Sequence, residues 1–506
     1  MVAATSPAGK RGRQSKDLTA SAELRTPFFG LFCATLLVTL TFGGSTGQGS
    51  PSDGVAQLAS VPLLALAAKK AWERGTLPRA AFLIAVGAAL LPLIELVPLP
   101  PRLWTLLPGR EEIAAIYSAA GVPLSWRPIS VIPSATWRAL GSALPAVAIF
   151  LGTLTFSRAQ RLAALALVVT VGVASAPLAA LQAFGGRESG FYVFDFTNTG
   201  HGVGFFANAN HFGAFESCLL PLAAAILTSL KRGSRALLLA ALAGILPAVL
   251  FGLALSGSRS ALAMGLAALL ASILAFGGAA TKRLCPWGVV GVAAALALLL
   301  APLMLDLGAT AILARFTSQD IAEDARWAIA RSALAGISTY FPFGSGLGTF
   351  PDVYPLHERV ADLTPKFVNH AHDDLLEAAF EGGAIALALI AAFLSWLAVA
   401  THRALSVRSA QQGRHEVLSA HASRSIGEDP RESEAFAEVG RSWRIALGGA
   451  IVLWLLLLHS LWDYPLHTIA LQSLFALCIG LQFAPASSSE TVRPPRPRMR
   501  IPFFPA

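Results

Sequence analysis

The amino-acid sequence predicts an all-α protein, a polytopic membrane bundle of about 12 transmembrane helices. Three observations favour this fold class. Of the 506 residues, 55% are hydrophobic and 13% are charged, roughly half the charged fraction that is usual in soluble domains. Apolar runs recur along the chain at close to the ~20 residues that a helix needs to cross a bilayer. Lysine and arginine are unevenly divided between the segments that connect these runs.

Each apolar run is expected to form one helix, because a helix satisfies its own backbone hydrogen bonds in lipid. The predicted spans lie at 28–44, 54–71, 79–99, 139–156, 162–184, 208–230, 236–256, 259–280, 286–308, 382–401, 445–463 and 466–484. The first run follows a basic stretch, as a signal peptide would. No small-residue cleavage site follows it, so we interpret it as a membrane helix.

The basic residues predict that both ends of the chain are cytoplasmic. With this orientation, 27 of the 38 lysines and arginines fall in cytoplasmic segments and 11 in outer ones, as the positive-inside rule requires. The expected organisation is a basic cytoplasmic N-terminus at 1–27, a membrane bundle at 28–484 with a periplasmic segment at 309–381 and a cytoplasmic loop at 403–444, and a disordered Pro/Arg-rich tail at 485–506.

Several classes of function are disfavoured by the composition. The net charge of +9 is attributed to cytoplasmic loops, so no nucleic acid is expected as a partner. The four cysteines lie in or beside apolar runs without a CxxC pair, which indicates apolar core residues rather than disulfides or a zinc site. No GxxxxGK[ST] loop for a nucleotide is present.

Polar clusters interrupt the apolar pattern at five places, and the predicted orientation brings all five to the outer face. The first is HGVGFFANANHFGAFE, beginning at His201. Asn208 and Asn210 there either cap the following helix or line a polar pocket. The second is SGSRSA, in which Arg259 is the one basic residue of its turn. This arginine either snorkels to the interface or binds a phosphate oxyanion.

The third cluster is DARWAIARSALAGISTYFPFGSGLGTFPDVYP. Arg326 and Arg331 fall on an expected amphipathic helix, and three glycines follow within GSGLG. The simpler interpretation of these glycines is a tight, flexible turn over the membrane surface. The functional interpretation is a segment that gates or shapes a substrate cleft.

The fourth cluster is VNHAHDDLLEAAFEGG, the densest concentration of charge in the chain. If the helix already includes these residues, Asp373, Glu377 and Glu381 form an i, i+4 row at the solvated entry of the helix. Solvated acids at a helix N-terminus are favoured by the helix dipole. His370 and His372 are alternatively metal ligands, but residues i and i+2 do not share a helix face, so no metal is expected.

The fifth cluster is HSLWDYPLH, at the outer turn between the last two helices. Asp463 there either caps the last helix or supports a catalytic group.

Taken in order, these five motifs resemble the O-antigen ligase and polymerase family, bacterial membrane glycosyltransferases that use polyprenyl-diphosphate-linked glycans. The segments that carry the resemblance are GFFANANHFGAFE, SGSRSAL, FPFGSGLGTFPDVYP, NHAHDDLLEAAFEGG and HSLWDYPLH. They span roughly residues 200–467. Two positions depart from the family pattern. Asp373 stands where asparagine is usual, and His201 stands where an arginine is frequent.

The resemblance implies an enzyme without cofactors that moves a saccharide from undecaprenyl diphosphate to a lipid A–core or other glycan acceptor. The reaction is expected to be inverting, metal-independent and periplasmic, in the inner membrane. His372 is the expected general base, and Arg259, helped by Arg326, is expected to stabilise the diphosphate. The remaining expected substrate-binding residues are Asn208, Asn210, His201, His370, Asp373 and Asp463.

Two alternatives stay open. The same motifs fit a polymerase, which joins one lipid-linked repeat to another. A non-enzymatic transporter or flippase is the second alternative, although its charges would be expected near the bilayer midplane rather than at one face.

Overall fold

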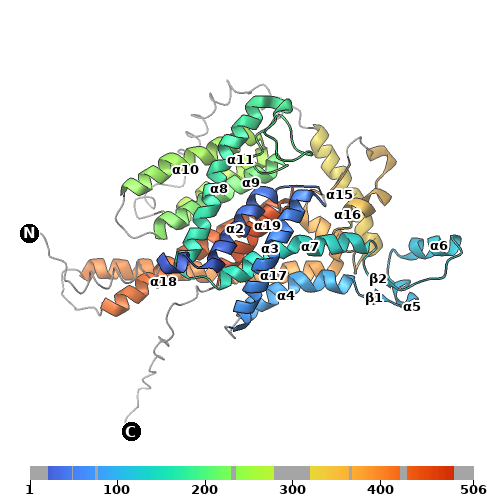
Figure 1. Cartoon of the computed structure of the whole chain (residues 1–506), viewed down its shortest axis with the longest axis horizontal. Helices are drawn as coiled ribbons and strands as arrows, with labels where there is room; N and C mark the ends of the chain where they lie inside the picture. The colour runs from blue at the N-terminus through green and yellow to red at the C-terminus, as the bar shows by residue number, and fades with distance from the viewer. Residues whose placement is uncertain are drawn as a thin grey trace, which may run out of the picture.

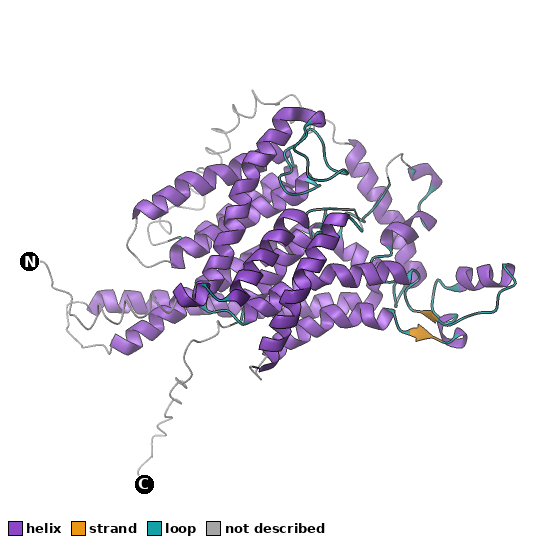
Figure 2. Ribbon diagram, viewed as in Figure 1, coloured by secondary structure: helices purple, strands orange, loops and turns teal. Residues whose placement is uncertain are grey.

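The computed structural model describes residues 21–47, 49–73, 78–229, 235–277, 320–363, 367–421 and 430–483. These residues form a polytopic helical membrane protein, as the sequence predicts. Helices account for nearly all of the secondary structure, and one two-stranded sheet lies at the edge of the molecule (Figures 1 and 2).

The helices follow the predicted apolar runs. In chain order the described α-helices are α2 (Pro27–Phe42), α3 (Pro51–Glu73), α4 (Arg79–Glu95), α5 (Pro101–Trp104), α6 (Glu111–Ala119), α7 (Pro133–Leu154), α8 (Arg158–Gly185), α9 (Ala209–Ser229), α10 (Arg235–Ser256), α11 (Arg259–Phe276), α15 (Asp320–Tyr340), α16 (Phe350–Val353), α17 (Asp374–His421), α18 (Pro430–His459) and α19 (Ile469–Leu481). Strands β1 (Pro98–Leu99) and β2 (Arg127–Pro128) pair antiparallel.

Six helices in the described part of the chain are long and apolar enough to cross a membrane. They are Pro133–Leu154, Arg158–Glu188, Ala209–Ser229, Arg259–Phe276, Asp374–Ala410 and Ser442–His459. Three shorter apolar helices accompany them at Pro27–Phe42, Gly244–Ser256 and Ile469–Leu481. The predicted span at 286–308 lies outside the described residues, as does the C-terminal tail.

Helix α9 lies at the centre of one half of the bundle. It contacts α8, α10, α11 and α18, and most of its side chains from Ala209 to Ala225 are buried. Small residues allow these close contacts. A Cβ added at Gly213 would lie 2.1 Å from the Cβ of Ala261, so α9 and the start of α11 touch almost backbone to backbone. The entry of α9 and the turn before α11 are thereby held together.

The segments that precede α7 and α17 form a cap at one end of the bundle. Helices α5 and α6 and the small sheet project there, and α15 and α16 lie beside them (Figure 1, right). A second hydrophobic core supports this cap, centred on Phe350, Tyr354 and Phe380. The five polar clusters of the sequence approach the bundle from loops and helix ends rather than from the middle of the spans.

Helix α17 differs from the prediction in two ways. It begins at Asp374, and Gly383 interrupts it with non-helical angles of φ 56° and ψ −143°. The expected i, i+4 row of solvated acids is therefore wrong. Glu377 and Glu381 are 1% and 3% exposed, because hydrogen-bond donors from neighbouring loops replace the water that a buried carboxylate would otherwise need.

Candidate active site

Asp463 is the centre of the candidate active site, in the turn between α18 and α19. Its carboxylate is fully buried. Asn210 donates from Nδ2 to Asp463 Oδ2 at 2.7 Å, and the backbone N–H of Tyr464 donates to Oδ1 at 2.9 Å. These two donors hold the carboxylate in place and link the entry of α9 to the turn between α18 and α19.

Three imidazoles surround the same carboxylate. His372 Nδ1 lies 3.4 Å from Oδ1, His459 Nε2 lies 3.7 Å from Oδ2, and His211 Nε2 lies 3.9 Å from Oδ1. Burial alone would raise the pKa of Asp463, but the neighbouring imidazoles of His372, His211 and His459 hold it well below its usual range. Asp463 is therefore ionised at neutral pH.

His372 is the histidine of this group that reaches solvent. Its side chain is 29% exposed, whereas those of His211 and His459 are fully buried. Its backbone has φ 54°, a left-handed conformation that is uncommon outside glycine and that clusters at functional sites. A ring that faces a buried carboxylate with one nitrogen and has solvent access is the arrangement of a general base.

Tyr464 is the aromatic residue around which the histidines pack. Its ring stacks on His370 with centroids 4.3 Å apart and meets the edges or faces of His211 and His372 at 4.8 and 5.0 Å. Asn208 donates to its hydroxyl at 3.4 Å. Tyr464 is 4% exposed, so it orders the imidazoles rather than presenting its hydroxyl to solvent.

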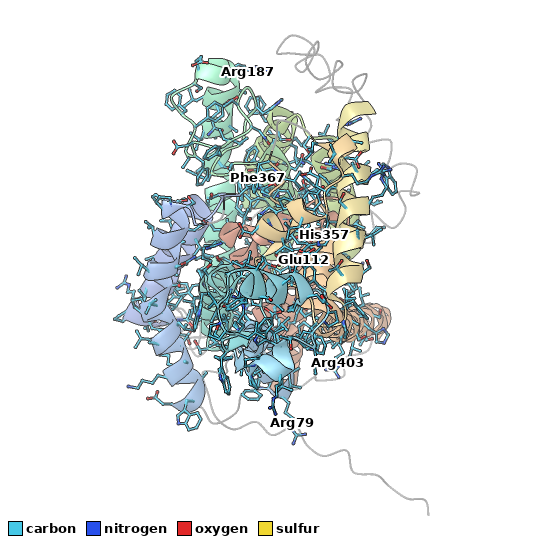
Figure 3. The ribbon with its side chains drawn as sticks, turned by 90° about the vertical axis from the view of Figure 1, so that its right-hand side faces the viewer. Arg79, Glu112, Arg187, His357, Phe367 and Arg403 are labelled. Atoms are coloured by element: carbon cyan, nitrogen blue, oxygen red, sulfur yellow. The ribbon has the colours of Figure 1, made fainter. Side chains whose placement is uncertain are left out.

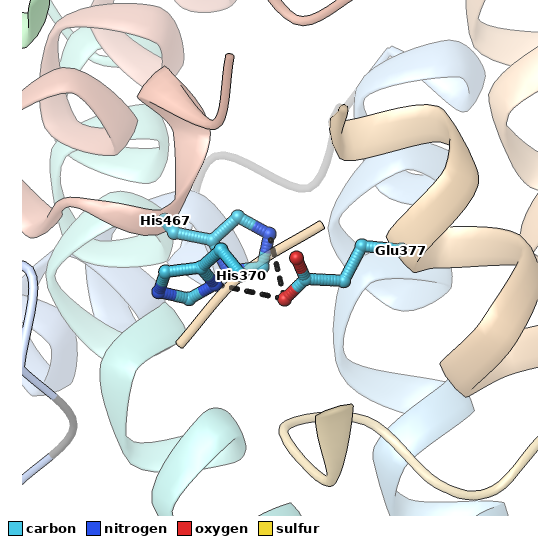
Figure 4. Close-up of side chains that lie close together, drawn as sticks. All are labelled: His370, Glu377 and His467. Atoms are coloured by element: carbon cyan, nitrogen blue, oxygen red, sulfur yellow. Dashed lines mark hydrogen bonds and ion pairs between the residues drawn. The ribbon is translucent and has the colours of Figure 1, made fainter. Parts of the chain in front are cut away.

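A second cluster lies on the other side of Tyr464 and joins His370, Glu377 and His467 (Figure 4). His370 donates from Nδ1 to Glu377 Oε1 at 2.9 Å, and His467 Nε2 lies 3.5 Å from the same oxygen. His467 Nε2 also lies 3.2 Å from Asp374 Oδ1. Although burial opposes the charged form, the two carboxylates raise the pKa of His467 to about 10.

This second cluster is also the group of described residues that offers the donor atoms of a metal site. The ligand atoms of His370, Glu377 and His467 all lie within 4.8 Å of one another. The predicted alternative paired His370 with His372, but the two rings face different carboxylates. A protonated His467 is compatible with the two carboxylates that lie around it.

The two asparagines at the entry of α9 have different roles. Asn208 Oδ1 accepts from the backbone N–H of Asn210 at 2.8 Å, which is the capping interaction that the sequence predicts for this position. Asn210 instead binds Asp463. Asn208 thus caps the helix, whereas Asn210 makes a polar contact with another cluster.

Asp373 caps α17 and does not face the imidazole of His372. Its Oδ1 accepts from the backbone N–H groups of Leu375 and Leu376, both at 2.9 Å. The carboxylate that faces His372 comes from Asp463, 91 positions further along the chain. The substitution at the usual asparagine position therefore acts on the start of the helix.

The glycines of GSGLG form a closely packed loop, and the flexible turn considered from the sequence is wrong. Gly344, Gly346 and Gly348 have φ values of 78°, 110° and 79°. A Cβ at Gly344 would lie 2.0 Å from the backbone oxygen of Glu381, and one at Gly346 would lie 2.5 Å from Ser130 Oγ. Glycine is required there both by backbone angle and by space.

Hydrogen bonds with two buried side chains hold this loop in place. Glu381 accepts from the N–H groups of Gly348 and Phe350 at 2.9 and 2.8 Å. Arg110, from the segment before α6, donates to the carbonyl of Gly344 at 2.9 Å. The loop thus fixes the position of α17 beside the cap, and it is built for shape rather than for movement.

The arginines occupy different surroundings. Arg259 is the first residue of α11, partly buried beside the entry of α9, and Ser258 caps that helix by accepting from the N–H of Ala261 at 3.1 Å. Arg326 is exposed on α15, and its charge reaches His459. Arg331 instead lies 3.9 Å from Asp362, away from the histidines.

His201 lies in the loop before α9, next to the same arginine turn. The N–H of Gly202 donates to the carbonyl of Leu255 at 3.0 Å, which places this loop at the end of α10. The side chain of Arg187 packs against Gly200, where an added Cβ would lie 3.5 Å from its Cγ. An arginine is therefore present beside this loop, although it comes from another part of the chain.

Four residues that complete the site were not selected from the sequence: His211, His459, Tyr464 and His467. Three of them lie in HSLWDYPLH, and the fourth lies next to Asn210. The signal was the unusual density of imidazoles in two short motifs. The sequence does not show how close these two motifs lie in the folded protein.

Comparison with known protein families agrees with this description. Residues 240–391 match the family model described as O-antigen ligase. No curated protein matches the chain at a significant level. The matched segment contains the arginine turn, the glycine loop and the loop that carries His370 and His372. Residues 240–391 are therefore similar to the O-antigen ligase family, in agreement with the motifs that the sequence carries there.

Proposed function

We propose that this protein transfers a saccharide from undecaprenyl diphosphate to an acceptor glycan at the periplasmic face of the inner membrane. The family supports a membrane enzyme that processes lipid-linked glycans. The single observation that carries the proposal is the partly exposed His372, whose Nδ1 lies 3.4 Å from the buried carboxylate of Asp463.

His372 is the proposed general base. With Nδ1–H directed at Asp463, its Nε2 is unprotonated and accepts the proton of the acceptor hydroxyl. The acceptor oxygen forms a bond to the anomeric carbon, and the bond from that carbon to the diphosphate oxygen breaks with its electron pair. Asp463 keeps the required tautomer and stabilises the imidazolium that forms. Attack opposite the leaving diphosphate gives inversion, and no step requires a metal.

Arg259 is the proposed partner of the leaving diphosphate. A guanidinium presents several donors in a fixed plane that matches phosphate oxygens. Arg259 is at the start of α11, which lies beside the entry of α9. Arg326, which is exposed on α15, is proposed as the second cation. A cation aimed at charge that develops in the transition state contributes to the rate.

The test is glycan transfer by the purified chain in liposomes that contain lipid-linked glycan. We expect Arg259→Lys to retain the fold and lose roughly 10²–10³-fold in rate, the effect of removing one oxyanion donor. Arg331→Gln is the matched control, since Arg331 pairs with Asp362 on the surface. Equal rates for the wild type and Arg259→Lys would show that Arg259 only snorkels to the membrane interface and does not bind the diphosphate.

The acceptor separates the ligase from the polymerase. Transfer to lipid A–core oligosaccharide identifies a ligase, whereas growth of the lipid-linked glycan identifies a polymerase. Movement of intact lipid-linked glycan across the bilayer without any new glycosidic bond would instead indicate a transporter. Transfer that is unchanged by a chelator is expected if the reaction is metal-independent.

A further inference from the structure

A cavity of about 540 Å³ lies among α8, α17, α18 and α19, away from the histidines. Its charged lining residues are Arg158, Arg161 and Arg403, and its aromatic lining residues are Trp396, Trp443 and Phe483. Among the described residues that line it, none is acidic. We call this space the arginine cavity.

The arginine cavity lies at the membrane face opposite the candidate active site. The candidate active site is at the His459 end of α18 and the Asp374 end of α17, whereas the cavity is lined by residues at the other ends of the same helices. The span Ser442–His459 corresponds to roughly 25 Å at ~1.5 Å per residue. Arg79 and Arg403 are both labelled in the lower part of the view in Figure 3.

Two arginines of the cavity differ in their surroundings. Arg161 holds the walls of the cavity together, whereas Arg403 lies at the surface. Arg161 is 2% exposed and donates to the carbonyl of Phe483 at 2.6 Å, which ties the start of α8 to the end of α19. Arg403 is exposed. The cavity therefore offers one guanidinium that is held by the fold and one that is accessible from the membrane surface.

The chemistry of this lining matches a phosphodiester at a membrane interface. Guanidinium groups bind phosphate oxygens in pairs, and tryptophan is favoured at the level of lipid headgroups. Basic pockets between transmembrane helices are suited to anionic lipid headgroups. Free phosphate would use the arginines alone, whereas a lipid would also use the aromatic walls for its glycerol and upper acyl chains.

We propose that the arginine cavity binds the phosphate headgroup of an anionic phospholipid in the leaflet opposite the candidate active site. The bound lipid would lie in the arginine cavity and contact α8, α17, α18 and α19 at once. This role is independent of the glycosyltransferase reaction and does not require the proposed orientation in the membrane.

The test uses the full chain purified in a non-ionic detergent. Native mass spectrometry and thermal unfolding would be measured after addition of phosphatidylglycerol, phosphatidylcholine or inorganic phosphate. We expect phosphatidylglycerol to bind and to raise the unfolding temperature, and the other two to have little effect. Arg403→Gln should weaken phosphatidylglycerol binding roughly tenfold, the effect of losing one charge-assisted hydrogen bond, and Arg403→Lys should retain part of it.

Arg408→Gln is the matched control. Arg408 lies on the same end of α17, donates to the carbonyl of Leu274 at 2.7 Å and does not line the cavity. Its variant should bind phosphatidylglycerol as the wild type does. Equal binding of phosphatidylcholine, an equal loss in both arginine variants, or stabilisation by inorganic phosphate that matches that of the lipid would each overturn the proposal.

Discussion

Asp463 and Glu381 both carry buried carboxyl groups at the same end of the bundle, and they differ in what surrounds them. Glu381 accepts from two backbone N–H groups of the glycine loop. Asp463 accepts from Asn210 and one backbone N–H and is faced by three imidazoles. Backbone donors cannot give up their protons, whereas an imidazole with an unperturbed pKa exchanges protons near neutral pH. We therefore interpret Glu381 as a residue that fixes the shape of the loop, and we propose that Asp463 supports proton transfer.

We expect a substitution at Asp463 to reduce the transfer rate more than the other substitutions do. Asp463→Asn keeps the volume of the side chain but removes the charge that orients His372 and stabilises its imidazolium. We expect transfer to fall by roughly 10²–10⁴, the usual contribution of general acid–base catalysis, while the protein stays folded. The measurement is initial transfer rate in liposomes together with circular dichroism. An Asp463→Asn variant with more than half of the wild-type rate would contradict this role.

Glu381→Gln, in contrast, is expected to reduce the stability of the fold. The amide presents N–H groups where the glycine loop requires an acceptor, so at least one buried backbone donor loses its partner. We expect a loss of about 1–3 kcal/mol in the free energy of unfolding and a lower yield of folded protein. Thermal unfolding of the purified variant is the measurement. If the variant were as stable as the wild type but inactive, Glu381 would belong to the chemistry rather than to the scaffold.

The cluster of His467 should make stability depend on pH. The pKa of His467 is raised to about 10 in the folded protein from about 6.5 in an unfolded chain. Its contribution to stability is therefore complete below about pH 6.5 and is lost as the pH rises to about 10. We expect the unfolding temperature to fall over this range, and His467→Arg, which keeps the charge, to reduce the fall.

A metal at the same residues would give another result. A metal-bound His467 would be neutral, and a chelator would lower the unfolding temperature at pH 7. An unfolding temperature that a chelator lowers but that does not change between pH 6.5 and 10 would contradict the ion pair and establish a metal site.

The smallest effect is expected at Asp373. Asparagine and aspartate cap helices about equally well, and the carboxylate of Asp373 is used by two backbone N–H groups. Asp373→Asn should change the transfer rate by less than about twofold, and Asp373→Ala should cost roughly 1 kcal/mol of stability. A pH–rate profile that shifted in Asp373→Asn would show that this carboxylate acts on His372 after all.

Much of the fold was predictable because the length of an apolar run is a local property of the sequence. The runs at 208–230 and 445–463 became α9 and the end of α18. The break at Gly383 was not predicted. It lies at the start of the predicted span 382–401, and its cause is the approach of a distant loop at Pro342 and Gly344. Burial of Glu377 and Glu381 was missed for the same reason, because the groups that satisfy them come from other loops.

The candidate site was predictable as a set of motifs but not as a geometry. The sequence placed His372, Asn210 and Asp463 in three separate polar clusters at one face. Nothing in their spacing shows that Asp463 faces His372 or that Asp373 does not. Contacts between segments more than 90 positions apart depend on how the helices pack, and the motifs record only which residue types are available.

We propose that His372 and Asp463 act as one unit in glycan transfer. The most direct measurement is a double-mutant cycle of transfer rates for the wild type, His372→Gln, Asp463→Asn and the double variant in liposomes with lipid-linked glycan. If the pair acts as a unit, the double variant should be about as slow as the slower single variant, because residues that act together are not additive. Independent losses that multiply in the double variant, or full transfer by His372→Gln, would contradict the account.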